Sequence, residues 1–220
     1  MNSTAAAHRV IAIDGPAASG KSSVAHDLAK RLDFVYVNSG AMYRAITWYV
    51  LQKQCDPRDG AAVAQLTESA SIVCDLVDKE SRILVDQIDP SPHLRDAPVN
   101  DNVSLISSVG RVREILVAKM RAYADDHDIV MEGRDIGSVV FPDTPYKFYI
   151  DAPPDVRLRR RLAQGQQDQI ALRDRVDSSR RASPLIIAED AHVIDSSSLT
   201  IEGVVGEIIG RLKMKGLAIN

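Results

Sequence analysis

The chain has 220 residues, of which 45% are hydrophobic and 26% charged, a balance that suits one globular domain with a buried core. Its formal net charge of −3 argues against a surface that attracts nucleic acid over its whole extent. Residues 1–9 lack the apolar core of a signal peptide, and no apolar run approaches the roughly 20 residues of a membrane helix. Cys55 and Cys74 are far apart and lack metal-ligand spacing, so we expect two free thiols in a cytoplasmic protein.

Short runs of β-branched and aromatic residues alternate with stretches of helical periodicity along most of the chain. The expected strands are 10–13, 34–37, 129–131, 147–150 and 192–194. The expected helices are 21–32, 41–52, 112–123, 156–163 and 201–212. Almost continuously apolar strands are typical of a parallel sheet that is covered on both faces, and the alternation predicts right-handed βαβ units.

One stretch departs from this alternation. Residues 71–77 and 82–85 are two β-type runs joined by a polar turn, which predicts an antiparallel hairpin. Pro90, Pro92 and Pro98 follow, and they argue against a helix there. The sequence therefore predicts a small β-rich insert at about 67–100 on an α/β core.

The run from Gly15 to Ser22 fits the phosphate-loop pattern GxxxxGK[ST], between an expected strand and an expected amphipathic helix. Such a loop turns its backbone N–H groups and the helix N-terminus toward phosphate oxygens. Lys21 is expected to reach the β- and γ-phosphates of ATP or GTP, and Ser22 to offer its hydroxyl to Mg²⁺. The expected nucleotide-binding set is Gly15, Pro16, Ala17, Ala18, Ser19, Gly20, Lys21, Ser22 and Ser23.

The expected strand at 129–131 ends in Glu132, followed by Gly133, Arg134 and Asp135. No Asn-Lys-x-Asp is present to read guanine, and the Asp-Glu ending usual in motor ATPases is absent. Because strand ends in a parallel sheet open onto the ligand crevice, Glu132 is expected to hold a water on Mg²⁺. Arg134 is expected to grip a phosphate, and Asp135 to accept hydrogen bonds from a sugar or a base.

Arginines are concentrated late in the chain, as Arg157, Arg159, Arg160, Arg161, Arg173, Arg175, Arg180 and Arg181. Fixed guanidinium groups stabilise the charge that phosphoryl transfer spreads over oxygens, and a mobile lid that carries them excludes water. We therefore expect a lid at about 157–180, with Arg157, Arg160 and Arg161 among the catalytic groups. The alternative is a basic helix that only faces solvent.

Several separated motifs together resemble the bacterial cytidylate kinase family, and they span essentially the whole chain after Arg9. The matching segments are Ser39-Gly-x-x-Tyr-Arg44, Ser104 with Arg111-Val-Arg113, Gly133 to Pro142, Arg173-Asp-x-x-Asp177-x-x-Arg180 with Pro184-Leu185, and Asp195 to Ser197. One departure is that the chain between Asp151 and Arg173 is shorter than is usual in the family, around Gln164 to Gln169. Glu132 stands where some relatives carry Asp.

The resemblance implies a three-layer α/β P-loop kinase fold in one domain, 1–220, with a five-stranded parallel sheet, the β-rich insert and the arginine-rich lid. It implies that CMP or dCMP accepts the γ-phosphoryl group of MgATP, giving CDP or dCDP and ADP. The residues implied to hold the phosphate and ribose of CMP are Ser39, Tyr43, Arg44, Arg134 and Asp135. Those implied to hold the base and the transferring phosphoryl region are Ser104, Arg113, Arg173, Asp177 and Arg180.

Two other functions stay open on the sequence alone. One is a kinase for another small acceptor, such as UMP, dTMP or shikimate. The other is a nucleotide-dependent switch that hydrolyses ATP slowly and responds to a partner, which the acidic charge balance disfavours. A monomer with small-molecule substrates is expected, because no exposed apolar stripe stands out.

Overall fold

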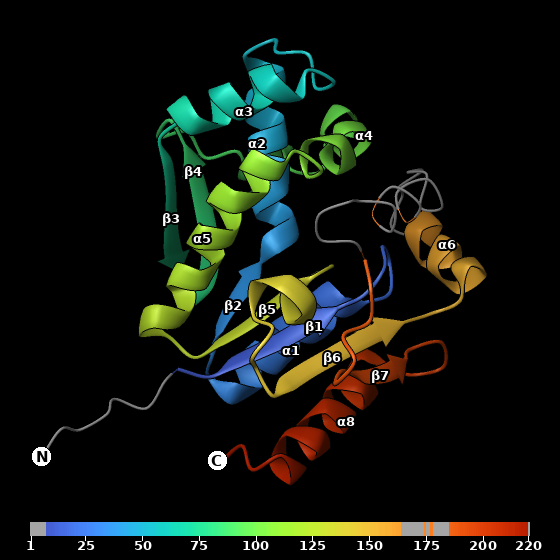
Figure 1. The fold of residues 1–220 in the computed structure, drawn as a ribbon. Coiled ribbons are helices and arrows are strands. Elements are labelled where there is room, and N and C mark those ends of the chain that lie inside the picture. Colours follow the sequence, from blue (N-terminus) through green and yellow to red (C-terminus); the bar gives the residue numbers. More distant parts are fainter. Residues whose placement is uncertain (1–7, 164–173, 175–176, 178–184, 220) are drawn as a thin grey trace, which may run out of the picture.

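The computed structural model describes residues 8–163, 174, 177 and 185–219, and their arrangement is shown in Figure 1. The five strands expected from the sequence run parallel to one another, in the order β2-β5-β1-β6-β7. Their bounds are β1 Val10–Asp14, β2 Val35–Asn38, β5 Ile129–Gly133, β6 Tyr146–Asp151 and β7 His192–Asp195. The predicted α/β class and the five parallel strands are therefore confirmed.

The expected hairpin forms from β3 (Ile72–Val77) and β4 (Glu80–Val85). It extends the same sheet, which has seven strands in the part of the chain described, in the order β3-β4-β2-β5-β1-β6-β7. The N–H of Tyr36 on β2 donates to the carbonyl of Lys79 at 2.8 Å, and the N–H of Asn38 donates to Ser81 Oγ at 3.1 Å. β4 pairs parallel with β2 and covers the β2 edge, where such groups would otherwise be unpaired, so the sheet is larger than the five parallel strands expected.

The helices are α1 Lys21–Leu32, α2 Ser39–Gln52, α3 Gly60–Ser69, α4 Ala97–Ile106, α5 Gly110–Asp126, α6 Pro154–Ala163 and α8 Ile201–Met214. Shorter turns are η1 Ser91–His93 and η2 Ile136–Val140, the second of them a π-helical turn. The helices predicted from periodicity are all present. Helix α3 was missed, although Asp59 marks its start by accepting the N–H groups of Ala61 at 3.1 Å and Ala62 at 3.0 Å.

Helix α4 corrects the expectation that the prolines exclude a helix. Pro98 is its second residue, where the backbone needs no N–H donor, so proline starts this helix instead of breaking it. Helix α4 and α5 pack with α2 on one face of the sheet.

Alternate residues of the central strand point into two hydrophobic cores. Val10 and Ala12 face the core formed with α2, α4 and α5, whereas Ile11 and Ile13 face the core formed with α1 and α8. This gives the three layers that Figure 1 shows, and it explains why β1 is buried along its whole length. None of the helices in the described ranges is long and apolar enough to cross a membrane.

The connections after β1, β2 and β5 all leave the sheet at the carboxyl ends of these parallel strands. They lead into α1, α2 and η2, so three segments that are distant in sequence meet there (Figure 1). In an open parallel sheet this end is where ligands bind.

Candidate functional site

A cavity of about 670 Å³ opens at the carboxyl ends of the central strands. It is lined by the phosphate loop, the start of α2, parts of α4 and α5, and the turn after β5. The predicted site residues that line it are Ala17, Ala18, Gly20, Lys21, Ser22, Ser23, Ser39, Tyr43, Arg44, Ser104, Arg113, Glu132, Arg134, Asp135, Arg161 and Asp177. Arg173, Arg180 and the segment predicted to be short, 164–169, lie outside the described residues.

Two glycines of the phosphate loop are required by its geometry. A Cβ on Gly15 would lie 2.1 Å from the carbonyl oxygen of Ile150, and Gly20 has a φ of +95° directly before α1. Lys21 begins α1, is buried, and donates from Nζ to the carbonyl oxygen of Pro16 at 3.0 Å. The lysine side chain therefore folds back over the loop that is expected to receive the phosphates.

The candidate Mg²⁺ site pairs the phosphate loop with the end of β5. Ser22 Oγ donates to Glu132 Oε1 at 2.7 Å, and Glu132 is buried. A hydroxyl and a carboxylate are oxygen donors of the kind Mg²⁺ prefers, and Mg²⁺ commonly uses few protein ligands beside the substrate phosphates. No group of three or more His, Cys, Asp or Glu side chains suited to a metal occurs within the described ranges.

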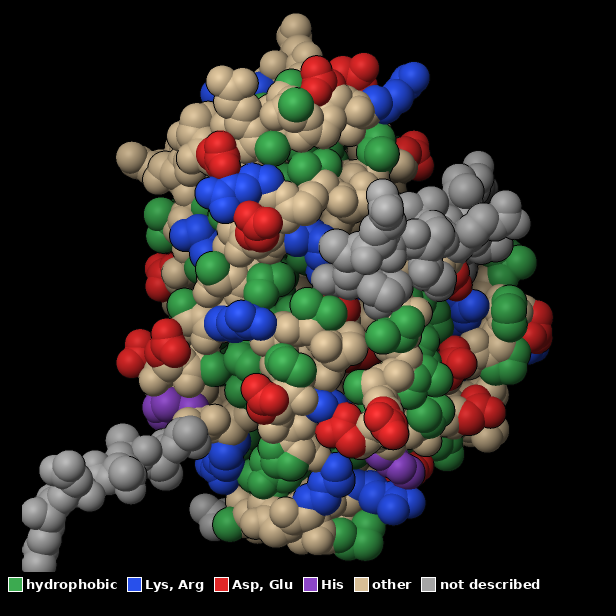
Figure 2. Space-filling model, viewed as in Figure 1, with side chains coloured by type: hydrophobic (Ala, Val, Ile, Leu, Met, Phe, Trp, Pro, Cys, Tyr) green, Lys and Arg blue, Asp and Glu red, His purple; other side chains and the backbone are tan. Residues whose placement is uncertain are grey.

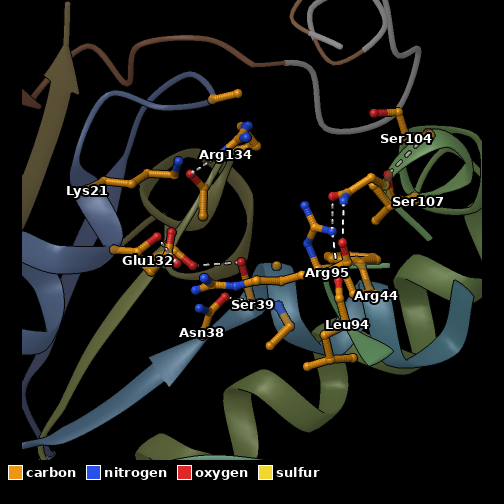
Figure 3. Close-up of a pocket in the computed structure, with 18 of the residues that line it drawn as sticks. Lys21, Asn38, Ser39, Arg44, Leu94, Arg95, Ser104, Ser107, Glu132 and Arg134 are labelled. Carbon is orange, nitrogen blue, oxygen red and sulfur yellow. Dashed lines mark hydrogen bonds between the residues drawn. The ribbon is translucent and has the colours of Figure 1, made fainter. Parts of the chain in front are cut away.

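Helix α2 brings the next group of predicted residues to the cavity. Asn38 caps the helix by accepting the N–H of Ala41 at 2.9 Å, and Ser39 Oγ donates to the carbonyl of Glu132 at 2.7 Å. One turn further, Arg44 Nη1 donates to Asn100 Oδ1 at 2.6 Å (Figure 3). These contacts fix the start of α2 against both β5 and α4.

The lining of the cavity includes residues that the sequence analysis did not single out. Asn38, Arg95, Asn100 and Ser107 all lie there, and Arg95 is exposed (Figure 3). Only Asn38 carried a signal, as an N-cap residue next to the predicted Ser39. The others lie between Arg95 and Ser107, on both sides of Pro98, in a part of the chain where no helix was expected.

Asp177 joins two segments that the sequence separates widely. Its Oδ1 accepts from Ser104 Oγ at 3.2 Å on α4, and its Oδ2 accepts from Arg134 Nε at 3.0 Å after β5. Asp177 is buried, so its carboxylate accepts from the neutral Ser104 hydroxyl and the cationic Arg134 inside the cavity wall. Three residues predicted to read the acceptor nucleotide are thus in contact.

Arg113 and Asp135 form a buried ion pair on the same side of the cavity. Arg113 Nη1 also donates to the carbonyl of Ser107 at 3.2 Å, and the guanidinium lies 5.3 Å from the centroid of the Tyr43 ring. Tyr43 therefore packs against a predicted site residue from within the hydrophobic core, and it also lines the cavity.

Two of the three predicted catalytic arginines on α6 contact the outside of the phosphate loop. Arg157 Nη1 donates to the carbonyl of Ala17 at 3.1 Å and forms an ion pair with Asp174. Arg160 Nη1 donates to the carbonyl of Ser19 at 3.2 Å. A loop that turns its N–H groups inward presents carbonyl oxygens outward, and the two guanidinium groups bind them there. Arg161 alone of the three lines the cavity.

Comparison with known proteins identifies relatives over almost the whole chain. The sequence profile of the family described as cytidylate kinase matches residues 11–214. A cytidylate kinase of Desulforamulus reducens is 39% identical over 213 residues, covering 92% of this chain and 96% of the relative. The cytidylate kinases of Caldanaerobacter subterraneus subsp. tengcongensis (90% of this chain, 92% of the relative) and Halalkalibacterium halodurans (92% and 96%) are each 41% identical.

Proposed function

Because this chain belongs to the cytidylate kinase family, we propose that the cavity transfers the γ-phosphoryl group of MgATP to CMP or dCMP, giving ADP and CDP or dCDP. The observation that carries the assignment of the site is that one cavity is lined by the phosphate loop and by the contacting group Ser104, Arg134 and Asp177. The loop would bind ATP, which donates the phosphoryl group, and the contacting group would bind the nucleotide that accepts it.

The chemistry asks the protein for position and charge more than for acid or base groups. The acceptor oxygen belongs to a phosphate that is already ionised, so in-line attack needs no general base. Lys21 neutralises charge on the β- and γ-phosphates, and Arg161 stabilises the transferring group from the lid side. Mg²⁺ bound with ATP would be held through Ser22 and Glu132 and would supply further charge neutralisation.

Discrimination of the base follows from the chemistry of the Asp177 carboxylate, which accepts hydrogen bonds and does not donate them. Cytosine offers an N4 amino donor, which a carboxylate accepts, whereas uracil places its O4 acceptor against the same carboxylate. A site with buried polar groups rejects an analogue that leaves those groups unpaired. Asp177 therefore favours cytosine, with Ser104 and Arg113 as donors to N3 and O2.

A panel of acceptors tests the proposed reaction. ADP formation from MgATP is measured with CMP, dCMP, UMP, AMP, dTMP and shikimate, and without an acceptor as the control. We expect kcat/KM for CMP and dCMP to exceed that for the other acceptors by on the order of 100-fold or more, because mispaired buried polar groups cost that much. High activity with a different acceptor would overturn the assigned base contacts, and acceptor-independent hydrolysis would support a switch.

The arginines of α6 give a paired prediction. Arg161→Ala should lower kcat on the order of 100-fold with little change in ATP affinity, because the proposed role of Arg161 is in the transition state. Arg160→Ala should instead raise the Kd for ATP, because Arg160 holds the phosphate loop through the carbonyl of Ser19. Single-turnover kinetics and calorimetric titration with ATP separate the two effects. A lower kcat with unchanged ATP affinity in Arg160→Ala would instead support the catalytic role that the sequence predicted for Arg160.

A further inference from the structure

Asp14 is a buried carboxylate at the edge of the site that the proposed reaction does not use. It is the last residue of β1 and directly precedes Gly15 of the phosphate loop. Its Oδ1 accepts the backbone N–H of Ile136 at 2.8 Å, and its Oδ2 accepts the backbone N–H of Gly137 at 2.8 Å. Both carboxylate oxygens are thus bound by one turn of η2, more than 120 residues away in sequence.

The two N–H groups belong to the turn that carries Arg134 and Asp135. Ile136 directly follows this pair, and Asp14 also lies beside Gly133 in the pairing of β1 with β5. The carboxylate therefore links the strand that leads into the phosphate loop with the segment that presents Arg134 to Asp177 and Asp135 to Arg113. The ATP side of the cavity and the side of the acceptor nucleotide meet at this contact.

Asp14 is an ionisable group in a buried position, where its two hydrogen bonds hold β1 to the segment after β5. Burial raises the pKa of Asp14 to about 7, although the two N–H donors oppose the shift. The ionisable groups that act on it from the surrounding elements are Lys21 on α1, Asp135 after β5 and Tyr149 on β6. Because the folded pKa lies above the ordinary value of 3.8, ionisation of Asp14 lowers the stability of the fold as the pH rises from 3.8 toward about 7. A carboxyl group kept at such a cost, on two backbone N–H groups beside the site, is consistent with a role in the site.

We propose that Asp14 is a positioning residue, which holds the Arg134–Asp135 turn at a fixed distance from the phosphate loop and so aligns the acceptor phosphate with the γ-phosphate of ATP. This inference rests on the proposed function of the cavity. Its specific content is that the contact acts on acceptor binding and alignment, while ATP binding depends on the loop itself. A misplacement of about 1 Å at such an alignment costs on the order of 100-fold in rate.

Asp14→Asn tests the contact with almost no change in the shape of the side chain. One of its two terminal atoms is an NH₂ group, which would face a backbone N–H donor and lose one of the two hydrogen bonds. We expect Asp14→Asn to raise KM for CMP on the order of 10-fold or more and to lower kcat, because a hydrogen bond to a charged group is lost. We expect the calorimetric Kd for ATP to stay within about 2-fold, because no atom of the loop itself is changed.

Asp128→Asn is the matched control. Asp128 precedes β5 and accepts the backbone N–H of Arg9, which precedes β1, at 2.6 Å. It therefore joins the same two strands at the end away from the cavity, with one backbone N–H and the Arg9 guanidinium as its donors. Asp128→Asn is expected to leave KM for CMP, kcat and the Kd for ATP unchanged, even where its Tm falls.

Hydrogen–deuterium exchange supplies a readout besides activity. In Asp14→Asn the peptide that contains Ile136 and Gly137 should exchange on the order of 10-fold faster, with peptides of β6 unchanged. Unchanged exchange, or a lower Tm with kcat and KM for CMP as in the wild type, would overturn the proposal. An equal loss of ATP and CMP affinity would overturn it too, because Asp14 would then support only the loop.

A second variant covers the case in which Asp14→Asn does not fold. The position of a Cβ on Gly137 is 3.1 Å from the Lys147 stem and 3.4 Å from Asp14 Oδ2, so Gly137→Val pushes the turn away while Asp14 remains. It should show the same selective rise in KM for CMP, and wild-type values for both nucleotides would overturn the proposal. Wild-type activity with CMP is measured first, so failure of the proposed reaction is distinguished from failure of the role of Asp14.

Discussion

Replacing Lys21 by alanine should lower kcat for transfer from MgATP to CMP on the order of 1,000-fold or more, in the range lost when a cation at the transferring group is removed. Lys21 is buried at the start of α1 and folds over the phosphate loop toward the carbonyl of Pro16. Its ammonium group is then close to the γ-phosphate as negative charge develops there. Coupled measurement of ADP formation at saturating CMP gives kcat, and single-turnover quenching separates chemistry from product release.

Lys30→Ala is the control for this variant. Lys30 is an exposed residue in the last turn of the same helix, so the same substitution there tests α1 stability without touching the site. We expect Lys30→Ala to retain wild-type kcat, with circular dichroism of both variants as in the parent protein. Near-normal kcat in Lys21→Ala would contradict the assignment of the phosphate loop.

Replacing Asp177 by alanine should raise KM for CMP by about 10- to 100-fold, because a charged acceptor is lost from a buried site. The KM for ATP should change by no more than about 3-fold, since Asp177 contacts Ser104 and Arg134, away from the phosphate loop. Initial rates over a grid of both substrates give the two constants. Equal changes in the two KM values would contradict the assignment of Asp177 to the base.

Asp177→Asn sharpens the same test. Its carbonyl oxygen still accepts from one neighbour, but its NH₂ group faces the amino group of cytosine and can donate to O4 of uracil. We therefore expect the ratio of kcat/KM for CMP to that for UMP to fall by about 10-fold or more. An unchanged ratio would show that another residue reads the base.

Asp174 provides the matched control, three residues earlier in the chain. Its Oδ1 accepts the N–H of Ala17 at 3.3 Å, and its carboxylate pairs with Arg157, so it faces the phosphate loop and not the acceptor side. Asp174→Ala is expected to raise KM for ATP more than KM for CMP. The two aspartates should thus give opposite selectivities.

The local motifs could be predicted from the sequence alone. The phosphate loop is contiguous, and its geometry depends on residues within it, such as Gly20 with its positive φ. The parallel strands were likewise visible, because strands buried on both faces are apolar along their whole length. Their ends also predicted where Glu132 and Arg134 would meet the loop, since parallel strands open toward one edge.

Contacts between distant segments were decided only by the tertiary structure. No local pattern shows that the hairpin would join the sheet beside β2, or that Pro98 would start a helix instead of ending one. The arginine pattern on α6 was readable, but which guanidinium would bind loop carbonyls depends on how α6 packs.

Asp14 shows why local motifs are predictable from the sequence whereas contacts between distant segments are not. In the sequence it is one more acidic residue at the end of a strand. Only the pairing of β1 with β5 places it under the N–H groups of Ile136 and Gly137. A motif fixes its own backbone, whereas the partner of a buried charge is fixed by the sheet order, which depends on every strand that competes for each edge.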